Sequence, residues 1–165
     1  MYIVSIYQEN NTSITENRKL YYTASKGTAD ATAAVSQATA INQPSNTPIY
    51  FAIDYDTAEE DFDDYIFPYV NAIIAYLSDN NLNPNNYRFG VYGSKLTCKK
   101  VRGNYSATER YTWMAYAWQY DSIVFNDWNI KQTSSQVELR EGNAYIWIDH
   151  DESSAVDFGA WKYSN

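Results

Sequence analysis

The sequence has very few of the residues that build disulfide and zinc sites: one cysteine, Cys98, and one histidine, His150, in 165 residues. A single cysteine excludes an internal disulfide, and the chain lacks the Cys/His spacing of zinc sites. Lys99 and Lys100 follow Cys98, and nearby cations can activate a thiol. Because no histidine lies near it in the sequence, we interpret Cys98 as an inert residue. We expect neither a metal nor a cofactor.

Positive charge is also scarce, with 12 Lys and Arg against 20 Asp and Glu and a net charge of −8. Such a surface repels phosphate backbones and anionic lipid headgroups, so nucleic acids and membrane surfaces are not expected partners. The first residues lack the basic region and apolar stretch of a signal peptide. The longest predicted helix, over 57–79, begins with carboxylates, which argues against membrane insertion. A glycine-rich phosphate loop and a nucleophile elbow are absent as well.

Aromatic residues, in contrast, are abundant: 17 Tyr, 5 Trp and 6 Phe. Tyrosine and tryptophan combine a flat apolar face with a polar group, which suits sugar rings and protein interfaces. Alternatively, tyrosine simply fills strand positions, where aromatic residues are favoured. With 45% hydrophobic residues, the chain is expected to form one globular domain over residues 1–165.

Short apolar runs alternate with helical patterns along the chain. The runs predict strands over 2–7, 49–53, 87–92, 112–118, 128–132 and 144–148. Apolar stripes predict helices over 27–41 and 57–79, with a short helix near 95–102. Thr57 and Glu60 have the spacing of a capping box at the start of the second helix. Strands that alternate with helices predict an α/β fold with a parallel sheet of about six strands.

Polar and aromatic residues follow the predicted strands, where parallel architectures place their sites. The candidate residues are carboxylates, amides and aromatics: Gln8, Asp54, Asp56, Tyr92, Trp118, Gln132, Asp149 and Asp151. This is the composition of a sugar-cleaving cleft, where one carboxylic acid protonates the leaving oxygen and another carboxylate stabilises the cation. Asp54 and Asp56 are two residues apart and face the same side of an extended strand. Two like charges held close together raise one pKa, which suits a general acid.

The acidic run over 54–64 has two other interpretations. Asp56 can favour the start of a helix electrostatically, and the whole run can form a solvated acidic face or a calcium site. An EF-hand loop matches poorly, because Ala58 and Glu59 stand where a ligand and a glycine are needed.

Residues 48–56, Pro-Ile-Tyr-Phe-Ala-Ile-Asp-Tyr-Asp, resemble the core motif of a bacterial glycoside-hydrolase-like family of unassigned function. That family is related to the glycoside hydrolase family 25 lysozymes, which are N-acetylmuramidases. Further matching motifs follow in order at residues 89–94, 113–115, 128–132, 148–151 and 157–161. Together they cover nearly all of residues 1–161.

The resemblance implies a TIM-barrel-like domain that acts on or binds cell-wall peptidoglycan or a related polysaccharide, outside the cell or on its wall. It implies Asp56 as the general acid, at a position where the lysozymes carry a glutamate that is one methylene longer. Asp54 and Asp149 match charge-stabilising carboxylates, Gln132 matches an amide and Tyr92 an aromatic of the sugar cleft. Gln8, Trp118 and Asp151 complete the predicted binding residues.

A complete barrel of this kind needs roughly 200 residues or more, so the resemblance implies a partial barrel that lacks N-terminal strands. An open barrel has exposed edges that invite pairing with another chain. We therefore expect either a trimmed domain or a sheet that closes by self-association. The alternative function is a catalytically inactive barrel that serves as a glycan-binding or assembly module, because a fold does not fix a function.

Overall fold

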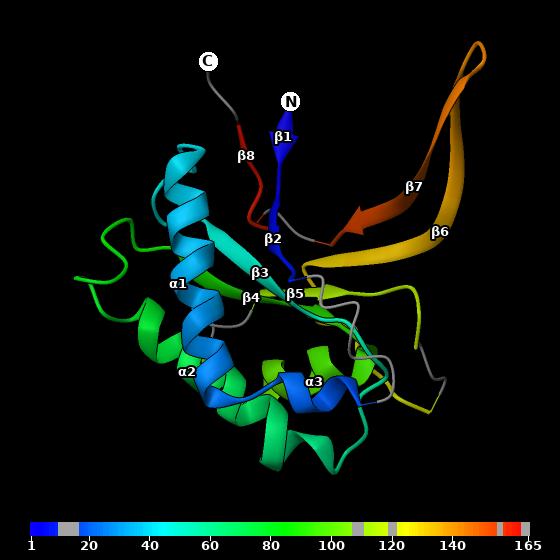
Figure 1. Ribbon diagram of the computed structural model, residues 1–165. Helices are drawn as coiled ribbons and strands as arrows, with labels where there is room; N and C mark the ends of the chain where they lie inside the picture. The colour runs from blue at the N-terminus through cyan, green and yellow to red at the C-terminus, as the bar shows by residue number, and fades with distance from the viewer. Residues whose placement is uncertain (10–16, 107–110, 119–121, 155–156, 163–165) are drawn as a thin grey trace.

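The protein has an α/β fold built on one curled sheet with helices packed on one face (Figure 1). The computed structural model describes residues 1–9, 17–106, 111–118, 122–154 and 157–162. The six strands of the sheet lie in the order of the chain: β2 (Ser5–Tyr7), β3 (Pro48–Ile53), β4 (Arg88–Gly93), β5 (Tyr111–Met114), β6 (Ile130–Glu141) and β7 (Ala144–Ser153). This confirms the predicted partial TIM-barrel-like fold.

One part of the predicted sheet is wrong. Strands β2 to β6 are parallel, but β7 runs antiparallel to β6. The reason is the connection: only the turn at Gly142 and Asn143 joins the two strands, and a parallel crossover needs a dozen or more residues. The two strands also extend well past the predicted ranges 128–132 and 144–148, and form a long hairpin that projects from the body (Figure 1).

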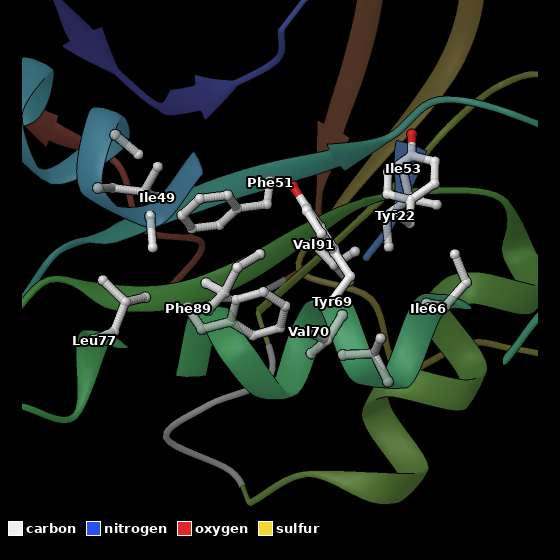
Figure 2. Close-up of a cluster of buried hydrophobic side chains, with 14 of the residues drawn as sticks. Tyr22, Ile49, Phe51, Ile53, Ile66, Tyr69, Val70, Leu77, Phe89 and Val91 are labelled. Carbon is white, nitrogen blue, oxygen red and sulfur yellow. The ribbon is translucent and has the colours of Figure 1, made fainter. Parts of the chain in front are cut away.

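The helices cover the outer face of the sheet. They are η1 (Arg18–Tyr21), α1 (Ala24–Ala40), η2 (Phe62–Ile66), α2 (Phe67–Leu77) and α3 (Lys95–Asn104). Phe51 and Phe89 stack 6.0 Å apart on adjacent strands, and Figure 2 shows them in the layer between the strands and α2, together with Tyr69 and Val70. Fully burying one such side chain contributes roughly 1.5–3 kcal/mol, so this layer fixes the outer face of β3 and β4. None of the described helices combines the length and apolar character needed to cross a bilayer.

The two ends of the chain lie side by side. β1 (Tyr2–Ile3) pairs antiparallel with β8 (Trp161–Lys162), and the Trp161 indole N–H donates to Ser5 Oγ at 3.2 Å. Just before β8, Gly159 has a φ of +78° and packs on Pro48, where any side chain would collide. The motif over 157–161 therefore packs against the start of β2 and the start of β3.

The predicted start of the second helix is wrong, because Thr57 is not its cap. Thr57 is buried, and its hydroxyl lies 2.8 Å from Ser94 Oγ and 2.9 Å from Thr97 Oγ1. The helix begins at Phe62 with a π-type turn, and Asp61 instead accepts the N–H of Ala58 at 3.0 Å. The hydroxyl cluster fixes the segment after β3 to the start of α3, next to the residues at the strand end.

Cys98 is a structural residue, as predicted. It is fully buried, its Sγ contacts the carbonyl oxygens of Gly93 and Trp113, and burial raises the pKa of its thiol to about 12. The neighbouring lysines thus do not activate it.

Among the described strands, only β3 pairs with β2, so the other edge of β2 is open. A groove of about 310 Å³ runs beside this edge and against the C-terminal half of α1. Its apolar lining includes Ile3, Ala38, Ile41 and Ile49. Such an edge is where an open sheet accepts another strand.

We predict that α1 and α2 depend on a glycine at their crossing. A Cβ at Gly27 would overlap the Tyr69 carbonyl oxygen and lie 3.1 Å from Ala72 Cβ. Gly27→Ala should therefore lower the free energy of unfolding by about 1–3 kcal/mol in urea denaturation. Gly103→Ala in α3 is the matched control, since nothing lies within 4 Å of its Cβ position. The control should gain up to about 1 kcal/mol from helix propensity. Equal effects at the two sites would contradict this account.

We predict, as a second test of the fold, that the open edge self-associates. Sedimentation velocity over a concentration series should show a species with twice the chain mass. Ile41→Lys places a charge in the groove and should shift the species to single chains, whereas Leu82→Lys, at an equally exposed position outside the groove, should not. A single-chain mass at all concentrations would rule out self-association.

Candidate functional site

Most of the predicted site residues lie around Tyr92, at the edge of the sheet where β2 to β5 end and the hairpin of β6 and β7 begins. The Tyr92 hydroxyl donates to Gln132 Oε1 at 3.2 Å, and Gln132 Nε2 donates to Asp149 Oδ2 at 2.5 Å. The Tyr116 N–H also donates to Gln132 Oε1, at 2.9 Å. Because a backbone N–H can only donate, it fixes the orientation of the amide. One glutamine thus links β4, the segment after β5 and the hairpin.

Asp149 is held on both of its oxygens. The second oxygen, Oδ1, accepts the N–H of Gln136 at 3.1 Å. Gln136 has a φ of +54° and lies in an irregular stretch of β6, where the register with β7 shifts between Ser134 and Val137. Bulges of this kind redirect backbone groups next to sites. Here the bulge directs an amide at the carboxylate.

Asp54 forms hydrogen bonds with a residue that follows β2 and with residues of the segment before α1. Gln8 Nε2 donates to Asp54 Oδ2 at 2.9 Å, and Arg18 donates to the Asp54 carbonyl at 2.6 Å. The Arg18 guanidinium also lies 3.7 Å from Asp54 Oδ2, and the Asp54 N–H donates to the Tyr22 hydroxyl at 3.0 Å. Arg18 and Tyr22 were not predicted, because they lie in a polar stretch that carries no pattern in the sequence.

Asp151 is paired with an aromatic side chain that we predicted as part of a motif but not as part of the site. The Trp113 indole N–H donates to Asp151 Oδ1 at 2.8 Å, and its ring meets the Tyr92 ring edge-on at 5.6 Å. Burial raises the pKa of the Asp151 carboxyl above its ordinary value; the Trp113 hydrogen bond opposes this increase and the charge of Asp149 adds to it. Asp151 thus keeps its proton to higher pH than an ordinary aspartate.

The pKa of the Tyr92 hydroxyl depends on its burial and on three nearby carboxylates. Burial raises the pKa of Tyr92 to about 12, and the charges of Asp54, Asp149 and Asp151 act in the same direction. The hydroxyl therefore stays protonated at neutral pH and remains a hydrogen-bond donor. We call the following side chains at this edge of the sheet the Tyr92 cluster: Gln8, Asp54, Tyr92, Trp113, Gln132, Asp149 and Asp151.

Two predicted site residues, Asp56 and Trp118, are not part of the Tyr92 cluster. Asp56 is exposed on the segment after β3, which ends at Ile53, so strand alternation does not set its direction as we had assumed. Trp118 is half-buried in a left-handed conformation, with a φ of +57°, which is unusual for a bulky residue. It immediately precedes residues 119–121, which lie outside the described part. The roles of Asp56 and Trp118 stay predictions.

Two carboxylates of the acidic run after β3 pair with nearby lysines. Lys19 Nζ lies 3.0 Å from Asp61 Oδ1, and Lys100 pairs with Glu59. The Tyr55 hydroxyl donates to Asp61 Oδ2 at 3.2 Å. In the described part of the chain, no group of three or more His, Cys, Asp and Glu side chains is arranged to hold a metal ion. The calcium interpretation of this run thus gains no support from its geometry.

A family model described as "Rv2525c-like, glycoside hydrolase-like domain" matches residues 1–153. Two proteins of Bacillus subtilis (strain 168) are similar to the chain: uncharacterized protein YbfG, 29% identical over 148 residues, and uncharacterized protein FadG, 27% identical over 153 residues. These alignments cover 85% and 84% of this chain but only 20% and 24% of the two relatives. The chain therefore spans at most a quarter of the length of these curated relatives.

Two crystal structures of the Mycobacterium tuberculosis Tat-secreted protein Rv2525c have the same fold. The complex with L-tartrate superposes with a TM-score of 0.76 at 20% identity, and the complex with HEPES with 0.73 at 22% identity. Each comparison covers 98% of this chain and 72% of the other. At this level of identity the likeness shows the shared fold alone.

We predict an acid-sensitive contribution to stability from Asp61, the buried carboxylate beside the site. Burial by itself raises the pKa of Asp61, but the Ala58 N–H and the Lys19 ammonium outweigh it, so the net pKa lies below the ordinary value. The contribution is therefore complete above the ordinary aspartate pKa and is lost as the pH falls through the lower, folded pKa. Asp61→Asn should cost about 1–3 kcal/mol at neutral pH and less at strongly acidic pH, in denaturant titrations across pH. Asp63→Asn, an exposed control, should leave the profile unchanged. A constant cost for Asp61→Asn at every pH would contradict the ion-pair explanation.

Proposed function

Because this chain belongs to the Rv2525c-like, glycoside hydrolase-like domain family, we propose that its Tyr92 cluster binds and cleaves a cell-wall glycan. The observation that carries the proposal is the arrangement of Asp54, which follows β3, and of Asp149 and Asp151 on β7, beside Tyr92 at the edge of the sheet where the parallel strands β3 and β4 end. Barrel enzymes place their sites at this end. Carboxylates beside tyrosine and tryptophan match the chemistry of glycoside cleavage and of sugar stacking.

The proposed mechanism divides the carboxylates by role. Asp56 matches the acid of the related lysozymes and would protonate the glycosidic oxygen. Asp54 and Asp149, each oriented by amide donors, would stabilise the positive charge that develops on the sugar or activate water. Gln8, Gln132 and Tyr92 carry the donors and acceptors that suit sugar hydroxyls. Asp151, whose pKa is raised, is the second candidate for the protonated group.

Peptidoglycan is the substrate class we propose, with action outside the cell. The lysozyme resemblance of residues 48–56 supports the substrate, and the secreted status of the structural neighbour supports the location. The acidic net charge of −8 suits neither nucleic acid nor anionic lipid.

A binding module without turnover is the second candidate function. The specific observation in its favour is the shorter acid: an aspartate at position 56 reaches one methylene less far than a glutamate would. General acid catalysis depends on hydrogen-bond reach to the leaving oxygen, so this shortening bears directly on cleavage.

The test is digestion of purified peptidoglycan, with the released fragments analysed by mass spectrometry. We expect muropeptides with new reducing ends from the wild-type chain. Asp56→Asn should reduce their release by about 10²–10⁴-fold, because it removes a general acid, and should leave the melting temperature unchanged, because the side chain is exposed.

Asp151→Asn and Asp63→Asn are the companion variants. Loss of release in Asp151→Asn with retention in Asp56→Asn would move the acid to Asp151. Asp63→Asn should behave as wild type. Binding to peptidoglycan without any release would replace the hydrolase with the binding module, and a folded chain that neither binds nor cleaves would refute the proposal.

A further inference from the structure

The hairpin of β6 and β7 exposes large apolar side chains at its outer end. Leu139, Tyr145, Ile146 and Trp147 are each more than half exposed, at 55%, 54%, 59% and 59%. Figure 1 shows this end projecting from the body of the protein, away from the helices. The function proposed for the Tyr92 cluster does not account for these side chains.

The two faces of the hairpin differ in chemistry. Tyr145 and Trp147 lie on one face, with ring centroids 6.2 Å apart and planes at 82°. The Arg140 guanidinium lies 5.1 Å from the Tyr145 ring centroid on the same face and also pairs with Glu138. Leu139 and Ile146 are opposite each other in the register and point to the other face. One face is aromatic and polar, and the other is aliphatic.

The aromatic face is continuous with the Tyr92 cluster. Alternate residues of a strand share one face, so Tyr145, Trp147, Asp149 and Asp151 follow each other along β7. The register shifts of the hairpin add residues to β6 only, so the alternation along β7 is unbroken. Each step is about 6–7 Å, which places Trp147 next to Asp149, the carboxylate held by Gln132.

We propose that Tyr145 and Trp147 form a second sugar-binding platform, which extends the Tyr92 cluster along the hairpin for a long glycan chain. This inference rests on the proposed function. The aromatic rings offer flat apolar faces to the C–H faces of sugar rings, and the neighbouring polar groups suit hydroxyls. The bracing of Tyr145 by Arg140 reduces the ordering that binding would require.

Charge indicates which glycan fits. Glu138, Asp149 and Asp151 lie on the same face of the hairpin as the platform, and the Arg140 guanidinium, which lies over the Tyr145 ring, pairs with Glu138. A sugar that carries its own negative charge would be repelled, so the platform suits the uncharged, N-acetylated hexosamine units of a glycan chain. Long chitin oligosaccharides are the simplest probe of this class, and chitobiose, which is too short to span both parts of the site, is its short counterpart.

The experiment is titration calorimetry of the whole chain with long chitin oligosaccharides and with chitobiose. Trp147→Ala and Tyr145→Ala should each weaken binding of the long oligosaccharides by about 3–10-fold and leave chitobiose binding unchanged. Trp147→Phe should restore most of the affinity. Leu139→Ala and Ile146→Ala, equally exposed on the opposite face, should have no effect.

The outcomes separate this inference from the function it rests on. Long-chain binding that is lost in Asp54→Asn but unchanged in Trp147→Ala would overturn the platform and keep the function. Equal losses of affinity from substitutions on the aromatic and the aliphatic face would also overturn the platform. So would a Trp147→Ala variant that binds normally but sediments with a lower mass, because Tyr145 and Trp147 would then form a contact between protein chains. A folded wild-type chain that binds neither these oligosaccharides nor peptidoglycan would overturn both.

Discussion

The in-register pairing of β3 with β4 is the constraint on which the rest of the structure depends. Ala52 pairs with Tyr92 and Ile53 with Gly93, so both strands end at the same level. Their outer side chains, such as Phe51 and Val91, are completely buried under the helices, and a shift by one residue would turn them to the other face. The same register carries Asp54 and Tyr92 to one edge. Packing on the outer face thus determines the site on the inner face.

The inner face has its own requirement, which is room for aromatic rings. Tyr50 lies across β4, where a Cβ at Gly90 would come 2.9 Å from its ring. The Tyr50 ring also meets Trp113 edge-on at 5.7 Å, and its hydroxyl donates to the Phe158 carbonyl at 2.9 Å. The abundant tyrosine therefore serves two purposes here, filling the barrel interior and providing polar groups at its mouth. The interpretation that tyrosine fills strand positions is confirmed at Tyr50, and contact of tyrosine with sugar rings stays a prediction.

The sequence was sufficient to predict the sheet and much of the site, for a physical reason. Apolar runs with covered faces identify parallel strands, and the residues that follow them meet at one edge, which is where Gln8 and Asp54 lie. Gln132 and Asp149 lie inside β6 and β7 instead, and they join the site because the base of the hairpin is beside the end of β5. The hairpin was underestimated because residues 133–136 are polar and β6 is irregular there, so the strand pattern breaks. Arg18, Tyr22 and the hydroxyl cluster of Thr57 act through contacts between distant segments, and no local pattern encodes such contacts.

The hydrogen bonds of the site run in one direction, and this direction limits what the site can do. Tyr92 keeps its proton and can donate to Gln132, whose carbonyl oxygen is also fixed by the Tyr116 N–H. The amide of Gln132 must then donate to Asp149, whose other oxygen accepts from Gln136. Both Asp149 oxygens thus accept hydrogen bonds from donors that the fold holds in place. In the mechanism we propose, Asp149 is therefore a residue that stabilises charge, and the proton for the leaving oxygen is assigned to Asp56 or Asp151. The orientation of Gln132 supports this division of roles.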